Sequence, residues 1–213
     1  MEKQPRIYLA LPNMGWVHTA LWSRVLQWAS SGRYLWQINP KMYVKPHHRA
    51  RNMLHKEFAE YDQGQPCDYV LWLDNDTIPP PNALEKMIED DVDVVSGTVM
   101  QWKMRGPRVV AWDRVDSGYI GLPPDRTKGL QRVDVGTLAC CLMKADVLRA
   151  MPPGAFFWSE IDEWHTNGPS EDTNFFGLVK DAGFEAYVDF DVPCEHVKEI
   201  GLLHVAQLIG GEA

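Results

Sequence analysis

Two carboxylates that are one residue apart follow the most apolar run of the chain. Asp74 and Asp76 come directly after VLWL (residues 70–73), which is typical of a buried strand, and directly before TIPPP (residues 77–81). Mg²⁺ and Mn²⁺ prefer oxygen ligands, and one or two carboxylates together with substrate phosphates commonly hold them. Asp and Asn also favour turns, so the residue types alone fit a turn as well. The position at the end of a strand favours a cation site.

A second pair of acids begins a predicted helix. Ser170 is a good N-cap residue, which places Glu171 and Asp172 in the first turn of a helix predicted over 171–182. The helix dipole stabilises ionised carboxylates there, and this effect alone accounts for many such acids. An ionised carboxylate is also the form in which a general base takes a proton from a hydroxyl group. The pair therefore fits either a helix start or a catalytic base.

The elements that would position these acids alternate between strand and helix. Apolar runs predict strands over residues 6–11, 37–38, 68–73, 93–99, 133–143 and 186–190. Apolar residues at helical spacing predict helices over 19–30, 49–61, 83–89, 145–151 and 171–182. The stretch 101–131 is rich in Gly, Pro and charge and predicts a long loop or lid. Such alternation is typical of an α/β sandwich with a largely parallel sheet.

Ligands of open α/β sheets bind at the carboxyl ends of the strands. The residues expected at that edge are Pro12 and Asn13, Asp74–Asp76, Gly97 and Thr98, and residues 191–196. The sequence therefore predicts that the binding site lies along this edge.

Charge and composition exclude several classes of protein. The 213 residues include 29 acids against 21 Lys and Arg, and the net charge of −8 argues against non-specific coating of DNA or acidic membranes. Residues 41–56 nevertheless carry five Lys or Arg, three His and no acid, which fits a local anion site or a solvated helix face. No run approaches the ~18 apolar residues of a membrane span. A cytoplasmic protein without a membrane partner is expected.

Nine tryptophans are an unusual feature of the composition. Trp packs well in cores, and it also stacks on flat faces such as sugar rings. Trp158 and Trp164 flank three acids just before the predicted helix at 171. This loop pair fits either recognition of a hydroxylated ring or packing against the core.

Four segments together resemble nucleotide-sugar glycosyltransferases of the GT-A fold, especially family-2-like members. In chain order they are VLWLDNDTIPPPNALEKMI, VDVVSGTVMQWK, VDVGTLACCLMKADVLRAM and GPSEDTNFFGLVKDAGFEAYVDFDVPCEHV. The resemblance covers residues 6–197 and implies a Rossmann-like αβα sandwich with a mixed, mostly parallel sheet in a single domain, 1–213. It also implies a nucleotide-binding half over about 1–100 and an acceptor-binding half over about 101–200.

The resemblance implies a role for each matching position. Asp76 would bind a Mn²⁺ or Mg²⁺ ion that bridges the diphosphate, and Asp74 would contact the ribose, the donor sugar or, through water, the metal. His196 matches the late metal-ligand histidine of the family, although a surface histidine also fits. Asp172 matches the general base, with Glu171 as its neighbour. The remaining donor contacts would come from Pro12, Asn13, Arg49, Arg51, Asn52 and Asn75.

The implied activity is that of a hexosyltransferase, which moves a sugar from a nucleotide-diphosphate donor, with UDP expected, to a hydroxyl acceptor. An in-line displacement with Asp172 as base would invert the anomeric centre, although retaining enzymes share most of these landmarks. Trp158 and Trp164 would then contact the acceptor. A glycan, a small molecule and a modified DNA base all remain open as the acceptor.

Two other classes fit parts of the pattern. Nucleotidyltransferases and nucleases also use paired acids at strand ends with divalent metals. A non-catalytic carbohydrate-binding protein would use the tryptophans alone. A phosphate-loop enzyme is disfavoured, because neither G-x-x-x-x-G-K-[ST] nor G-x-G-x-x-G occurs.

Overall fold

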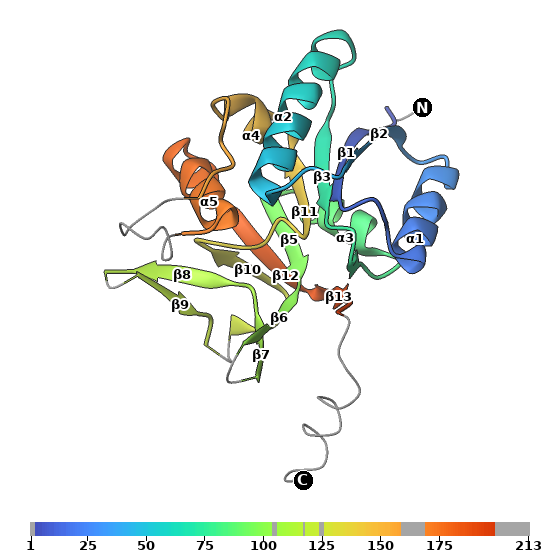
Figure 1. Cartoon of the computed structure of the whole chain (residues 1–213). Helices are drawn as coiled ribbons and strands as arrows, with labels where there is room; N and C mark the ends of the chain where they lie inside the picture. Colours follow the sequence, from blue (N-terminus) through green and yellow to red (C-terminus); the bar gives the residue numbers. More distant parts are fainter. Residues whose placement is uncertain (1–2, 104–105, 117, 124–125, 159–168, 199–213) are drawn as a thin grey trace.

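A seven-stranded sheet forms the centre of the protein (Figure 1). The computed structural model describes residues 3–103, 106–116, 118–123, 126–158 and 169–198. In spatial order the strands are β10 (Leu130–Val133), β12 (Ala186–Pro193), β5 (Val94–Thr98), β11 (Cys140–Lys144), β3 (Tyr69–Leu73), β1 (Arg6–Asn13) and β2 (Leu35–Met42). Strands β10 and β11 run antiparallel to their neighbours, whereas the other neighbouring pairs are parallel. The expected mixed, mostly parallel sheet is confirmed.

Helices cover both faces of the sheet and complete an αβα sandwich. Helices α1 (Thr19–Ser30) and α3 (Ala83–Glu89) lie on one face, and α2 (His47–Gly64), α4 (Ala145–Ala150) and α5 (Glu171–Asp181) lie on the other. Successive side chains of a strand point to opposite faces. In β1, Leu9 therefore packs in the core beneath α1 and α3, whereas Tyr8 packs in the core beneath α2. This arrangement confirms the predicted single-domain α/β fold.

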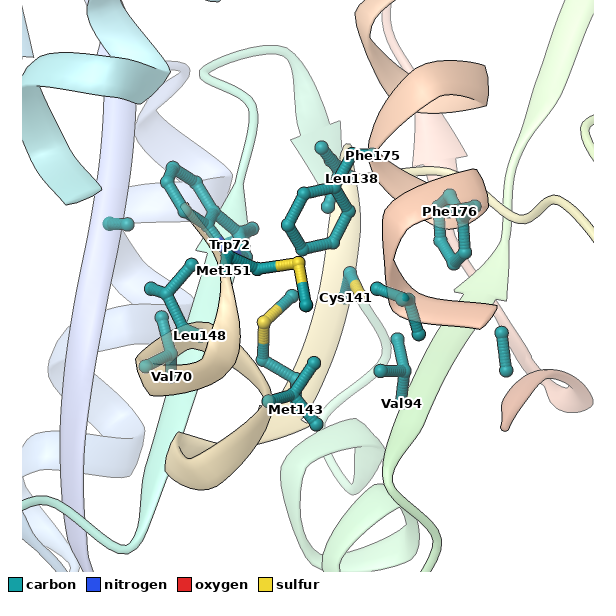
Figure 2. Close-up of a cluster of buried hydrophobic side chains, with 14 of the residues drawn as sticks. Val70, Trp72, Val94, Leu138, Cys141, Met143, Leu148, Met151, Phe175 and Phe176 are labelled. Atoms are coloured by element: carbon teal, nitrogen blue, oxygen red, sulfur yellow. The ribbon is translucent and has the colours of Figure 1, made fainter. Parts of the chain in front are cut away.

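The core beneath α4 and α5 supports the start of α5. Figure 2 shows Phe175 and Phe176 of α5 beside Trp72 of β3 and Cys141 of β11. The ring of Phe156 stacks on Phe175 with 4.7 Å between centroids and 8° between planes. These buried aromatic rings hold α5 rigidly against the strand that precedes Asp74.

The predicted capping of α5 is confirmed. The Ser170 hydroxyl accepts a hydrogen bond from the Thr173 backbone N–H at 3.4 Å. The helix ends before Gly183, which adopts the left-handed conformation with φ of +87°. Glu171 and Asp172 therefore lie in the first turn, as predicted.

The stretch 101–131, predicted as a loop or lid, contains two β-hairpins. One joins β6 (Met100–Lys103) to β7 (Gly106–Val109), and the other joins β8 (Trp112–Val115) to β9 (Gly118–Gly121). Each strand has only four residues, and charged residues in β6, β7 and β8 and glycines in β9 interrupt the apolar residues, so no apolar run marks them. The prediction of a loop was wrong for these segments.

The single strand predicted over 133–143 is also wrong. Strand β10 ends at Val133 and β11 begins at Cys140, and the two are not neighbours in the sheet. The intervening segment is apolar because it is buried, with Val135, Leu138 and Ala139 in the core. Burial, rather than strand pairing, explains the apolar pattern there.

A small two-stranded sheet lies beyond the carboxyl end of β3. Strand β4 (Thr77–Ile78) pairs antiparallel with β13 (Glu195–His196), and His196 lies opposite Thr77. This pairing joins the segment after Asp76 to the end of the described chain. Across the described ranges, no helix is long and apolar enough to cross a membrane.

Candidate active site

The four acids singled out from the sequence line one cavity. This cavity, called the active-site cavity below, has a volume of about 460 Å³. Asp74 and Asp76 reach it from the end of β3, whereas Glu171 and Asp172 reach it from the start of α5. The fold thus brings together two acidic pairs that are almost 100 residues apart in the chain.

Arg51 joins the two acidic pairs. Its Nη2 atom lies 3.1 Å from Asp74 Oδ1 and 3.9 Å from Asp172 Oδ1. The side chain is only 2% exposed, and its guanidinium lies 5.7 Å from the centroid of the Trp72 ring. Burial alone would lower the pKa of Arg51, but Asp74 and Asp172 raise it above its ordinary value. Arg51 is therefore a buried, charged link between the carboxylates.

The two carboxylate oxygens of Asp172 differ in their hydrogen bonds, and Oδ1 is a buried atom. Its Oδ2 atom accepts hydrogen bonds from the Leu138 backbone N–H at 3.2 Å and from the Thr137 hydroxyl at 3.4 Å. Its Oδ1 atom has no hydrogen-bond partner within the part of the chain that the structure describes. Burial raises the pKa of Asp172 to about 6, although Arg51 opposes the increase. Asp172 is therefore a buried carboxyl group whose pKa is raised to about 6.

Asp76 lies among cationic and imidazole groups instead. Its carboxylate is 3.5 Å from His196 Nε2 and 2.5 Å from Lys198 Nζ. Burial by itself would raise the pKa of Asp76, but hydrogen bonds from His196 and Lys198 lower it to about 2. The backbone N–H of Val197 donates to the Asp76 carbonyl at 2.9 Å, which ties the β13 segment to this position.

The chemistry of Asp76 and His196 fits a divalent metal ion. His196 Nδ1 lies 2.8 Å from the Met100 carbonyl oxygen and Nε2 lies 3.5 Å from Asp76, and the hydrogen bond to Asp76 raises the pKa of His196. A neutral ring that donates through Nδ1–H to Met100 would leave the Nε2 lone pair for a metal ion. Metal-binding histidines typically donate their second N–H to a carbonyl or carboxylate in this way. No group of three or more His, Cys, Asp or Glu side chains in the described ranges could hold a metal ion. The protein thus offers two ligands, and substrate oxygens would have to complete the shell.

Two of the predicted donor contacts, Asn13 and Asn75, are buried and hold backbone segments. The Asn13 side chain accepts from the Gly15 N–H at 2.9 Å and donates to the Leu11 carbonyl at 3.3 Å. Asn75 donates to the Trp16 carbonyl at 3.1 Å. Neither side chain lines the active-site cavity.

Three further predicted donor contacts also lie outside the cavity lining. Asn52 donates to the Phe156 carbonyl at 2.6 Å and accepts from the Phe156 N–H at 3.1 Å. Pro12 is buried within β1, and Arg49 is exposed on α2. Donor contact by these residues stays a prediction. Of the two arginines in the basic stretch 41–56, Arg51 lines the cavity and Arg49 does not.

The two tryptophans predicted for the acceptor have different outcomes. Trp158 lines the cavity and is 53% exposed, so its ring is available to a ligand. Trp164 lies outside the described residues. The sequence reasoning missed Trp112, which also lines the cavity, because its strand was read as part of a loop. It also missed His47, for which the basic stretch 41–56 gave a signal, and Lys198, whose segment carries more acids than bases and gave none.

Comparison with solved structures places the fold. The structure is similar to A197 from STIV, with a TM-score of 0.62 and 18% identity over 92% of this chain and 86% of that one. It is also similar to GalNAc-T7, solved with UDP, GalNAc and Mn²⁺, with a TM-score of 0.53 and 8% identity over 92% of this chain. The match covers 43% of the GalNAc-T7 chain. No protein-family model and no curated protein matches the sequence. The protein thus has the expected GT-A fold. Sequence identities this low establish a shared fold and not a shared activity.

Proposed function

We propose that the protein is a metal-dependent glycosyltransferase that moves a sugar from a nucleotide-diphosphate donor to a hydroxyl acceptor, with UDP as the nucleotide. The observation that carries the proposal is that Asp74, Asp76 and Asp172 line one cavity. Arg51 lies between Asp74 and Asp172 and pairs with both. Such a transfer needs two features, a site for a cation and a general base. The similarity to GalNAc-T7, which was solved with UDP and Mn²⁺, supports the choice of donor.

Asp76 and His196 would hold the metal, Mn²⁺ or Mg²⁺, together with diphosphate oxygens. Bound there, the metal would neutralise the negative charge of the leaving nucleotide diphosphate. Lys198, which lies at hydrogen-bond distance from Asp76, would add a further positive charge beside the phosphates. Asp74 would contact the ribose or the donor sugar while Arg51 holds its carboxylate in place.

Asp172 would take the proton from the acceptor hydroxyl. Its Oδ2 atom accepts hydrogen bonds from Leu138 and Thr137, which fixes the carboxylate. The acceptor hydroxyl would have to reach the buried, unpaired Oδ1 atom. Attack by the acceptor oxygen on the anomeric carbon from the side opposite the diphosphate would invert that centre. Residues 1–100 would then supply most of the donor contacts, and residues 101–200 the base and the acceptor surface with Trp158.

Replacing Asp76 by Asn tests the donor half of the proposal. The variant keeps the size of the side chain but removes the charge that a metal needs, so we expect Mn²⁺-dependent release of UDP from UDP-sugars to fall by about 100-fold or more. Asp113→Asn on β8 is a matched control, because Asp113 is not among the cavity-lining residues. Equal rates for the native protein and the Asp76 variant would contradict the proposed metal site.

Replacing Lys198 by Met separates metal binding from donor binding. The ammonium group lies 2.5 Å from Asp76 Oδ2 and repels a cation that approaches this carboxylate. We therefore expect Lys198→Met to bind Mn²⁺ about tenfold more tightly when no nucleotide is present. UDP binding in the presence of Mn²⁺ should weaken, because one positive charge beside the phosphates is lost. Calorimetric titration with Mn²⁺ and then UDP measures both, and a shift of both affinities in the same direction would count against these roles.

A further inference from the structure

A second cavity adjoins the active-site cavity through one shared tryptophan. This second cavity has a volume of about 390 Å³ and is lined by residues of β7, of the β8–β9 hairpin and by Phe190 of β12. Trp112 lines both cavities. The segment 108–112 therefore forms a wall between them, with Val110 lining the active-site cavity and Val109 and Ala111 lining the second one.

The two cavities differ in chemistry. Among the residues that the structure describes, four carboxylates line the active-site cavity, whereas Arg108 is the charged residue that lines the second cavity. The rest of its lining is largely apolar and includes Val109, Ala111, Ile120, Leu122 and Phe190. An uncharged apolar group gains free energy by leaving water for such a surface.

The volume limits the size of the occupant. Cavities of about 300–1,000 Å³ are typical sites for small molecules, and this cavity is near the lower end of that range. The acceptor hydroxyl must lie beside Asp172, so whatever is attached to the acceptor ring extends away from Asp172 along a neighbouring surface. Trp112 lines both cavities, so an acceptor that extends past Trp112 would reach the second cavity.

We infer that the second cavity binds an apolar group, of the size of a phenyl or short alkyl aglycone, that is attached to the hydroxyl-bearing ring of the acceptor. The inference rests on the proposed function for the identity of that ring as an acceptor. The apolar group binds against Ile120 and Phe190 while the ring lies in the active-site cavity. The acceptor is accordingly a glycoside with an apolar aglycone rather than a free sugar.

The test compares matched acceptors that differ only in the aglycone. Methyl, octyl and phenyl glycosides of the common hexoses are supplied with a UDP-sugar and Mn²⁺, and transfer products are quantified. For at least one hexose we expect kcat/KM to be about tenfold higher for the phenyl or octyl glycoside than for the methyl glycoside, which is the effect of burying one apolar group. The Ile120→Asp variant should lose that preference and leave the release of UDP without acceptor unchanged.

Tyr119→Asp is the matched control. Tyr119 and Ile120 are adjacent on β9 and are 44% and 58% exposed, so neither substitution threatens the core, yet only Ile120 lines the second cavity. The control should keep the preference for apolar aglycones. Equal kcat/KM for methyl and phenyl glycosides of every hexose, or equal loss in both variants, would overturn the inference.

A binding measurement keeps this inference separate from the proposed function. Calorimetric titration of native protein and the Ile120→Asp variant with the same glycosides requires no turnover. If UDP release is absent with every donor, the proposed function fails, but tighter binding of phenyl than methyl glycosides that depends on Ile120 still supports the second site. Absence of that difference in binding overturns the site even where UDP release is observed.

Discussion

The Asp172→Asn variant loses nearly all glycosyl transfer while it still binds the donor. Positioned general bases typically contribute about 10²–10⁴-fold to a rate, so we expect kcat to fall by about that factor. The amide preserves the shape of the side chain and can still contact Arg51, but it cannot take the proton from the acceptor hydroxyl. Product formation and Mn²⁺-dependent UDP binding, measured on the same preparation, separate the two effects.

The pH dependence of the rate provides an independent check on the role of Asp172. Burial raises the pKa of this carboxyl to about 6, with Glu171 and Asp74 adding to the increase and Arg51 opposing it. Below that pH the group is protonated and cannot act as a base. The rate should therefore rise with pH through about 6 and then level, and the residual activity of Asp172→Asn should lack this limb.

Stability measurements on the Asp172→Asn variant test whether unfolding causes its loss of glycosyl transfer. Because the folded-state pKa of Asp172 is raised from 3.8 to about 6, the folded protein binds more protons than the unfolded chain between these values. Its contribution to stability therefore decreases as pH rises through this window, and the ionised group is unfavourable at neutral pH. We expect Asp172→Asn to melt no lower than the native protein at pH 7.5. Asp181→Asn, at the exposed end of α5, is the matched control and should keep full activity.

Removal of Arg51 should cause the largest loss of stability. In Arg51→Met, Asp74 and Asp172 lose the cation between them, and removing one partner from a buried ion pair typically costs about 3–5 kcal/mol. For a domain of this size that loss lowers the Tm by about 10 °C. The destabilisation should shrink as pH falls below about 6, because Asp172 then becomes neutral. Thermal unfolding at pH 5 and pH 7.5 measures both effects.

Arg49→Met is the control for Arg51. Arg49 is exposed and lies two residues earlier on the same helix, so its replacement should change stability by less than about 0.5 kcal/mol. The rise of the rate with pH that we assign to Asp172 should also occur at higher pH in Arg51→Met. Without the positive charge of Arg51, the pKa of Asp172 is expected to be higher. A loss of stability below about 1 kcal/mol, or one that is the same at both pH values, would show that Arg51 is not the buried link described.

The features predicted correctly from the sequence are those that depend on residues adjacent in the sequence. An apolar run that ends at Asp74 is a local signal for a buried strand, and Ser170 before two acids is a local signal for a helix start. Both acidic pairs were therefore placed correctly within their elements. Their meeting in one cavity follows from the order of strands in the sheet, which the resemblance implied but no local pattern specifies.

The features that were missed depend on packing between distant segments. Donor contact by Arg51 stays a prediction, but its burial against Asp74 through the packing of α2 was not predicted. Trp112 reaches the cavity from a four-residue strand that shows no apolar period. The resemblance implied that His196 and Asp76 share a site, but the pairing of β4 with β13 that brings them together was not predicted, because two-residue strands carry no recognisable sequence pattern.

The most direct test of the central claim is the appearance of free UDP from a panel of UDP-sugars with Mn²⁺, compared with nucleoside triphosphates and DNA under the same conditions. The account predicts release of UDP from one or more UDP-sugars, loss of that release with a chelator and in Asp76→Asn, and no reaction of the triphosphates or DNA. Turnover of triphosphates or DNA in place of the sugar nucleotides would contradict it in favour of a nucleotidyltransferase or nuclease. Sugar binding that survives chelation, with no UDP released from any donor, would contradict it in favour of a non-catalytic carbohydrate-binding protein.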